Sequence, residues 1–406
     1  MHGEAHARIE DLSPAERRLS FRVLYASVLS LGMGMSVIYV VLPPVGREMG
    51  LGEFSINALF VLSSAIWVIM GPWWGRRLGR WHRRPALMIG LASNGVTLVL
   101  FALVLERAHA GLLPLIVAYP LFMLARVLHS VFGPGGTSAA QAYLAERTSA
   151  HERVVALAYL SGSFGLGATI GPGVGALLTQ VSLTAPLYFV ALLALLGIAG
   201  VAFGVRERAH PAATAVVAHL SMRDPRIVMP MAVGVVIGFG QALTVQTAAF
   251  FVMDRLGHAG ADAAHHVGMA LMTTSGAALI AQVLLVPRLK LTPEVLQNVG
   301  LAAFAASFVV IAATRTDGML IAGMVLNGLG SGIARSGNVG LASLSVRLDE
   351  QGAIAGLIGA AATLGFVISP FIAIPLYRLD PAVPFAAMAA VMTATLIWSI
   401  RRGDRD

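Results

Sequence analysis

Charge is scarce in this sequence and cysteine is missing altogether. Of its 406 residues only 12% are charged, against about a quarter in soluble domains, and none is cysteine. The lack of cysteine excludes disulfide bonds, thiolate catalysis and cysteine-ligated metals. What fills the chain instead is apolar: 57% of the residues are hydrophobic and the mean hydropathy is +0.79. This composition indicates a membrane protein.

Several other signals are missing. The first twenty residues are polar and charged, so we expect no cleavable signal peptide. The chain shows no phosphate-binding loop, nucleotide site or cluster of metal ligands. We therefore expect that the protein binds no cofactor and no metal, and that it is neither an enzyme nor an ATP-driven pump. The net charge of +8 is not gathered on a soluble domain, and we expect no nucleic-acid partner. Ser13, Pro14 and Glu16 form a capping-box pattern, which predicts a short cytoplasmic helix leading into the first span.

Twelve apolar runs are long enough to cross a bilayer, which takes about 20 helical residues each. We place them at 21–43, 54–75, 85–105, 112–144, 154–179, 185–205, 227–253, 266–287, 295–314, 318–345, 353–377 and 383–400. The pattern predicts an all-α membrane protein with twelve transmembrane helices.

Basic residues favour one side of these spans. With a cytoplasmic N-terminus, 21 of the 28 Lys and Arg residues fall in cytoplasmic segments and five in outer loops. The remaining two, Arg126 and Arg335, lie inside spans. Because basic loops stay in the cytoplasm, we expect both termini there, in a multi-pass protein of a bacterial inner membrane. We expect a monomer in contact with the lipid bilayer.

A polar segment over 206–226 divides the spans into two sets of six. Aligned 198 residues apart, the halves pair Glu152 with Glu350 and Pro172 with Pro370. Two pseudo-symmetric six-helix bundles around a midplane site are typical of secondary transporters. We therefore predict a cytoplasmic segment over 1–20, bundles over 21–205 and 227–400, a cytoplasmic linker over 206–226 and a tail over 401–406.

The run from Gly162 to Gly175 is the most informative motif. It places Gly167, Gly171 and Gly175 four residues apart on one helix face, with Pro172 between them. Positions without side chains let two membrane helices approach until their backbones touch, and the proline permits a bend. The run resembles the glycine-proline signature in the fifth helix of the twelve-span drug:proton antiporters of the major facilitator superfamily. That resemblance covers nearly the whole chain and implies the major facilitator fold and export by alternating access.

A second signature joins the second and third spans, from Gly71 to Pro85. It resembles the superfamily's loop motif, which implies roles in gating and helix packing for Gly71, Gly75, Arg76, Arg80, Arg83 and Arg84. We expect a glycine to close the helix end and the arginines to face the cytoplasm. The alternative is that the arginines only anchor the helix ends at the lipid headgroups. Gly79 stands where the family carries an acidic latch residue. Glu146 is available to pair with Arg83 or Arg84 instead.

A third signature lies in the fourth span. Arg126, His129 and Ser130 resemble the family's RxxxG element, with Ser130 in the glycine position. An arginine at the bilayer centre costs about 2.5–3.5 kcal/mol to insert, so it is seldom retained without a use; the alternative is a structural arginine bound by nearby carbonyls. The resemblance places the first, fourth, seventh and tenth spans around a central cavity. The residues predicted to line it, each of which could equally serve in helix packing, are Tyr39, Arg126, His129, Gln141, Gln241, Gln246, Asn327, Arg335 and Asn338.

Acidic residues avoid the interior of the spans: none of the 20 falls deep within one. Proton-coupled exporters often carry a carboxylate there that binds and releases the proton. The candidates for proton coupling are therefore His129, Glu146 and Arg126. The predicted function is proton-coupled export of hydrophobic or amphiphilic small molecules. Two alternatives stay open: transport of an organic anion bound by Arg126 and Arg335, and a non-transporting membrane sensor.

Overall fold

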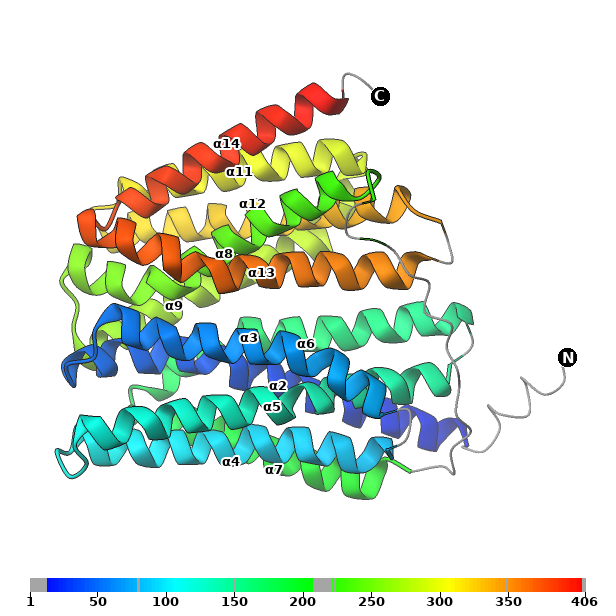
Figure 1. Ribbon diagram of the computed structural model, residues 1–406, viewed down its shortest axis with the longest axis horizontal. Coiled ribbons are helices and arrows are strands. Elements are labelled where there is room, and N and C mark those ends of the chain that lie inside the picture. Colours follow the sequence, from blue (N-terminus) through cyan, green and yellow to red (C-terminus); the bar gives the residue numbers. More distant parts are fainter. Residues whose placement is uncertain are drawn as a thin grey trace, which may run out of the picture. The chain divides into compact units, whose positions relative to one another are not determined.

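The computed structural model describes residues 13–78, 81–148, 150–206, 221, 224–347 and 350–403, and every element in these ranges is helical (Figure 1). The elements are α2 (Pro14–Glu48), α3 (Glu53–Arg77), α4 (Arg83–His109), α5 (Leu115–Glu146), α6 (Ala150–Leu178), α7 (Ala185–Gly204), α8 (Val228–Leu256), α9 (Gly260–Ile280), η1 (Ala281–Leu285), α10 (Val286–Leu289), α11 (Pro293–Ala312), α12 (Asp317–Leu344), α13 (Gln351–Leu379) and α14 (Val383–Gly403). With Gly260–Leu289 counted as one, 11 described helices can cross a membrane by length and composition, and α6 adds another 29 residues. The predicted all-α membrane architecture is confirmed.

The first helix is longer than its predicted span. The backbone nitrogen of Ser13 donates to Glu16 Oε2 at 3.0 Å, and the Glu16 nitrogen donates to Ser13 Oγ at 3.3 Å, which confirms the capping box. The short helix predicted before the first span is therefore continuous with it. At its other end, α2 runs through Pro43 and Pro44 to Glu48. The predicted end at residue 43 was wrong because each proline removes only its own N–H donor, a loss that membrane helices tolerate.

Two further boundaries differ from the prediction. Helix α3 runs through Gly71 and Gly75 to Arg77, so neither glycine closes the helix end. A Cβ added at either glycine would meet no atom within 4 Å, so neither is required for close packing here. The predicted span over 266–287 begins at Gly260, because Gly257 ends α8 with a positive φ of 80° and α9 starts soon after. Gly79 and Arg80 of the predicted loop motif lie outside the described residues.

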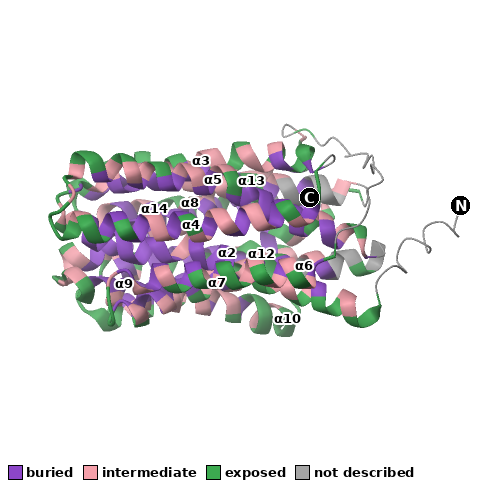
Figure 2. Ribbon diagram, turned by 90° about the horizontal axis from the view of Figure 1, so that it is seen from below, coloured by how far each residue is buried: buried purple, intermediate pink, exposed green. Residues whose placement is uncertain are grey.

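The helices group into two compact units. One comprises Met1–Val41 and Leu62–Thr214, and the other comprises Leu42–Val61 and Ala215–Asp406. In the first unit Trp74 lies in the core among Leu24, Leu91 and Tyr143, and its Nε1 donates to the Val131 carbonyl at 2.7 Å. In Figure 2 buried residues, in purple, alternate with exposed residues, in green, along the helices. Large apolar side chains are among the exposed ones, such as that of Phe203, which is 91% exposed. Such outward apolar surface suits contact with lipid.

The glycine face of α6 packs on α2, as the run from Gly162 to Gly175 predicts. A Cβ added at Gly167 would lie 2.0 Å from the Leu29 carbonyl oxygen, and one at Gly171 would lie 3.1 Å from the Met33 carbonyl oxygen. At Gly175 the nearest atom is Val40 Cβ, 3.3 Å away. The two backbones therefore touch at positions where any side chain would separate them.

The same contacts recur in the second unit. A Cβ added at Gly32 on α2 would lie 2.2 Å from the Phe164 carbonyl oxygen of α6. One added at Gly238 on α8 would lie 2.2 Å from the Ala362 carbonyl oxygen of α13, 198 residues after Phe164. The positions on α6 and α13 are 198 residues apart, as in the repeat read from the sequence, whereas the two glycines on α2 and α8 are 206 residues apart.

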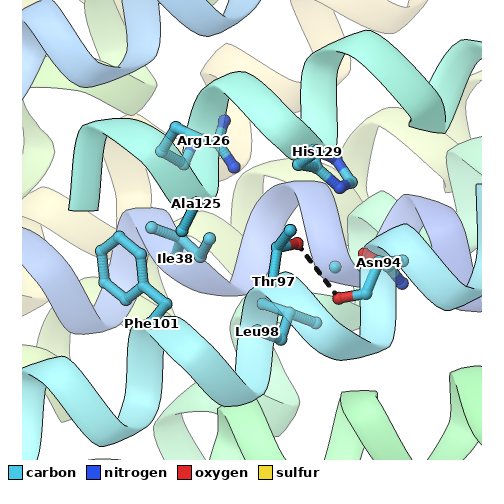
Figure 3. A pocket seen from close by; sticks show the side chains of 9 residues that line it. Ile38, Asn94, Thr97, Leu98, Phe101, Ala125, Arg126 and His129 are labelled. Atoms are coloured by element: carbon cyan, nitrogen blue, oxygen red, sulfur yellow. Dashed lines mark hydrogen bonds between the residues drawn. The ribbon is translucent and has the colours of Figure 1, made fainter. Parts of the chain in front are cut away.

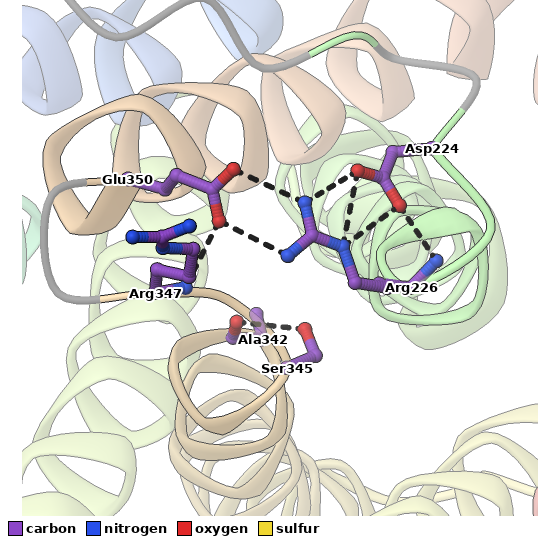
Figure 4. A network of polar contacts seen from close by, with 6 residues as sticks. All are labelled: Asp224, Arg226, Ala342, Ser345, Arg347 and Glu350. Carbon is purple, nitrogen blue, oxygen red and sulfur yellow. Dashed lines mark hydrogen bonds and ion pairs between the residues drawn. The ribbon is translucent and has the colours of Figure 1, made fainter.

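Two salt bridges involve the glutamates that the repeat aligns, Glu152 and Glu350. Arg17 Nη2 donates to Glu152 Oε2 at 2.8 Å, between α2 and α6. Arg226 donates through Nη1 to Glu350 Oε2 at 3.1 Å, where α8 and α13 begin, and through Nη2 to Asp224 Oδ2 at 2.7 Å (Figure 4). The hydrogen bonds from Arg226 hold the pKa values of Asp224 and Glu350 below their ordinary values of 3.8 and 4.5.

Lowering the pH is expected to remove the stabilisation that the ion pairs of Arg226 with Asp224 and Glu350 give to the fold. A lowered carboxyl pKa stabilises the fold above the ordinary pKa, and this contribution is lost as the pH falls through the lowered one. Glu350→Gln should therefore lower the unfolding temperature at neutral pH, and the difference from the parent protein should vanish in acid. Thermal unfolding of the purified protein across that range measures this. Glu294→Gln, at an exposed carboxylate in the first turn of α11, is the control; a Glu350→Gln deficit that persists in acid would contradict the assignment.

Candidate functional site

A small polar cavity lies between α2, α4 and α5 of the first unit (Figure 3). Its volume is about 10 Å³, which leaves room for about one water molecule and none for a drug-sized ligand. The residues that line it are Gly34, Ile38, Asn94, Thr97, Leu98, Phe101, Ala125, Arg126 and His129.

Helix geometry brings Arg126 and His129 together. They are three residues apart on α5, hence on one face, and each is only 4% exposed. Asn94 faces them from α4 and donates to the Ser30 carbonyl of α2 at 3.3 Å. Gly34 makes room for this amide, since a Cβ there would lie 2.1 Å from Asn94 Oδ1. Asn94 is not among the residues predicted for the site, although an asparagine in the middle of an apolar span is a signal of such a role.

Four of the nine residues that line the cavity are polar: Asn94, Thr97, Arg126 and His129. Among the described residues, His129 Nε2 and Asn94 Oδ1 are buried without a hydrogen-bond partner. Tyr39, 5% exposed, interacts electrostatically with Arg126. Buried polar atoms of this kind are costly unless a water or proton satisfies them. Of the residues that line the cavity none is acidic.

Ser130 holds the same stretch of α5 against α3. Its Oγ lies 2.5 Å from Ser63 Oγ, and both side chains are buried. One turn later Gly133 accommodates the Trp67 ring, whose nearest atom would lie 2.6 Å from an added Cβ. The Trp67 ring centroid is 5.6 Å from that of His129. The serine in the family's glycine position therefore forms an interhelical hydrogen bond next to the cavity.

The loop arginines form a network at the α3–α4 connection. Arg83 donates through Nε to Glu146 Oε1 at 3.0 Å and through Nη1 to the Leu78 and Trp81 carbonyls. The predicted pairing of Glu146 with Arg83 is thereby confirmed, whereas Arg84 donates to the Ala202 carbonyl. Because Glu146 sits in an ion pair at the last residue of α5, it is not submerged in the span. Arg76 is exposed at the end of α3.

The remaining predicted site residues fall into two groups. Buried amides join helices: Gln246 Nε2 donates to the Phe366 carbonyl at 3.2 Å, and Asn327 Nδ2 donates to Ser307 Oγ at 3.2 Å. Asn338 is buried as well, next to Gly234. Gln241 is half-buried, while Gln141 and Arg335 are exposed on their own units. Arg335 lies in the interior of α12, and an arginine exposed so far along a membrane helix indicates a water-accessible surface rather than lipid.

The profile of the Major Facilitator Superfamily matches residues 24–370, which is most of the chain. The chain belongs to this superfamily. Like its relatives, it is a transporter and not an enzyme. The class B tetracycline resistance protein of Escherichia coli is 27% identical over 374 residues, 88% of each chain. Multidrug resistance protein 2 of Bacillus subtilis (strain 168) is 22% identical over 406 residues, 96% of this chain and 97% of the relative.

Solved structures support the major facilitator fold. A bacterial homologue of the human lysosomal transporter Spinster, in an inward-facing and occupied conformation, superposes with a TM-score of 0.70 at 14% identity. The alignment covers 96% of each chain. The expected fold class is thus confirmed for this multi-pass membrane protein.

This major facilitator also carries a charged cluster that the sequence analysis missed. In the second unit Arg47, at the end of α2, donates to Asp254 of α8 and to Glu53 of α3, the latter at 2.5 Å. Tyr377 Oη of α13 donates to Asp254 Oδ2 at 2.8 Å. The guanidinium carbon of Arg47 lies 5.5 Å from the centroid of the Phe250 ring. The sign of this cluster in the sequence was the presence of opposite charges at the ends of spans. Which of these charges pair is decided by how the helices pack.

Proposed function

We propose that this major facilitator exports hydrophobic or amphiphilic small molecules in exchange for protons by alternating access. The similarity to a tetracycline resistance protein and a multidrug resistance protein over most of the chain carries the export part. The buried Arg126–His129 cavity, which can hold about one water, supports the proton part.

His129 is the proposed proton carrier. Imidazole is the side chain whose ordinary pKa lies nearest physiological pH, and the Nε2 atom of His129 has no hydrogen-bond partner among the described residues. Protonation would place a second cation beside Arg126, three residues away on one helix face. A conformation that admits water or substrate to the cavity would then be favoured, which couples proton uptake to movement. Glu146, held by Arg83, is proposed as a latch rather than a carrier.

A flux assay tests both parts. In proteoliposomes, a panel that includes a tetracycline, a quinolone and a lipophilic cation should be moved only with a proton gradient. One proton moving through about 100 mV supplies roughly 2.3 kcal/mol, enough for about a fifty-fold substrate gradient. His129→Gln should abolish the dependence on the pH gradient, while His109→Gln, the same substitution at an exposed histidine that ends α4, should keep it.

Each outcome decides one part. Equal flux after the pH gradient is collapsed would remove proton coupling and leave export intact. An unchanged pH dependence in His129→Gln would remove His129 as the carrier. No flux of any compound would remove export and favour a sensor.

A second candidate function is transport of an organic anion. Its support is the presence of two arginines within spans: Arg126 at the cavity and an exposed Arg335 in the interior of α12. Arg335→Gln should then raise the dissociation constant of an anionic substrate and leave that of a neutral one unchanged. Binding of anions that survives this substitution would argue against it.

We further propose two six-helix bundles over 21–205 and 227–400 in a bacterial inner membrane, acting as a monomer with both termini in the cytoplasm. The excess of basic residues in the segments assigned to the cytoplasm supports the orientation. Reporter fusions at the two termini, active only in the cytoplasm, measure it.

A further inference from the structure

Two histidines and two aspartates gather in the second unit, where α8 ends and α9 and α12 begin. His258 lies in the turn between α8 and α9, His266 lies on α9, and Asp317 is the first residue of α12. One ligand atom from each of these three lies within 4.8 Å of the other two. Asp262, on α9, contacts both histidines. Under the proposed orientation this end faces outward.

The hydrogen bonds orient both imidazole rings. His258 Nδ1 lies 2.5 Å from Asp262 Oδ2, and His266 Nδ1 lies 2.9 Å from the Asp262 backbone carbonyl oxygen. An Nδ1–H bonded to a carboxylate or carbonyl orients the ring and turns Nε2 toward the space where an ion would bind. A cation bound there would take the place of the proton that His258 Nε2 otherwise shares with Asp317. His258 Nε2 is also 3.0 Å from Asp317 Oδ1. The two rings stack, with centroids 3.7 Å apart and planes 17° from parallel.

We propose that His258, His266 and Asp317 bind a divalent transition cation, for which Zn²⁺ is the fitting probe. Two imidazole nitrogens and one carboxylate oxygen form a donor set that suits zinc and leaves a fourth position for water. Asp262 is the outer partner that orients both rings, in the arrangement that metal-binding histidines commonly show. The side chains of His258 and His266 are 19% and 29% exposed, so the site is shaped by packing yet open to an ion.

The local backbone supports the site. Gly257 and Gly260 both have positive φ, 80° and 54°, which a glycine adopts without strain. These residues make the tight turn that sets His258 against the first turn of α9. Thr316 caps α12 by accepting from the Met319 nitrogen at 3.3 Å, so Asp317 is held at a defined helix start. A bound ion would therefore tie the α8–α9 turn to α12.

Zinc titration of the full-length protein tests the site. The protein is purified without a polyhistidine tag, stripped with a chelator, and titrated with Zn²⁺ by calorimetry. We expect one saturable Zn²⁺ per chain. His266→Gln should weaken binding by more than tenfold, and Asp262→Asn by about 10- to 100-fold, the usual range for an outer partner. His109→Gln, at an exposed histidine that ends α4, should leave the affinity unchanged.

A second readout keeps the test independent of folding defects. X-ray absorption at the zinc edge of the loaded parent protein should show nitrogen and oxygen ligands at about 2.0–2.2 Å with imidazole scattering. The absence of saturable binding in the parent protein, or equal affinity in the parent and in His266→Gln, overturns the proposal. Loss of binding in His109→Gln alone also overturns it, because the ion then binds elsewhere. Binding does not depend on transport, so failure of the export assay leaves this test intact.

Discussion

Gly167→Ala is expected to lower the free energy of unfolding of this transporter by about 1–3 kcal/mol, the usual cost of overpacking a close contact. The new Cβ would lie 2.0 Å from the Leu29 carbonyl oxygen and 2.8 Å from its carbon. Both are backbone atoms of α2, which no rotamer change can move aside. Since α6 and α2 must separate to admit the methyl group, flux should fall as well.

Gly165→Ala is the matched control, because the same substitution two residues away on α6 meets no atom within 4 Å. Alanine forms helix better than glycine by about 1 kcal/mol, so this variant should be as stable as the parent or more so. Unfolding of both purified variants by heat and denaturant, followed by the flux assay, measures the difference. Equal stability of the two variants would show that the α2–α6 contact is looser than described.

Arg83→Gln is expected to lower the free energy of unfolding by about 1.5–3 kcal/mol, the range for a hydrogen bond that involves a charged group. Arg83 is 8% exposed and joins the α3–α4 connection to the end of α5 through Glu146. A glutamine side chain is too short to contact Glu146 and the Leu78 and Trp81 carbonyls at the same time. These groups therefore lose a hydrogen-bond donor that water replaces only in part. If the network latches one transport state, the balance of states and the flux should change too.

Two comparisons isolate the geometry of this network. Arg83→Lys keeps the charge but lacks the planar fork of nitrogens, and it should recover less than half of the lost stability. Arg76→Gln removes an arginine of the same motif that is exposed at the end of α3 and should have little effect. The result would contradict the latch if Arg76→Gln and Arg83→Gln were equally destabilising.

Helix positions could be predicted because the bilayer allows few alternatives. Within a membrane every backbone group must be bonded, so each apolar run of sufficient length has to be helical. The ends were less predictable: α2 continues through Pro43 and Pro44, and α3 continues through Gly75. Proline and glycine end helices in water, but neighbouring helices and lipid remove the competition from solvent that makes them do so.

The candidate site was predictable only in part. Arg126 and His129 stand out because charge and imidazole are rare in apolar spans, and the structure places both at one cavity. Asn94 and Arg47 escaped notice, since their roles depend on which helix they meet. Gln246 and Asn327, which are predicted to line the substrate cavity, also donate hydrogen bonds between helices, and the sequence could not show which helices these are.

By itself the sequence determined that this protein is a helical membrane transporter of the Major Facilitator Superfamily, and that α6 carries a glycine face. These properties follow from hydropathy and from spacing along one chain, which a sequence contains directly. Only the tertiary structure decided that the face meets Leu29 and Met33, that Glu146 pairs with Arg83 rather than Arg84, and that His258 lies beside Asp317. Such partners lie far apart along the chain or on different helix faces, and packing alone selects among them.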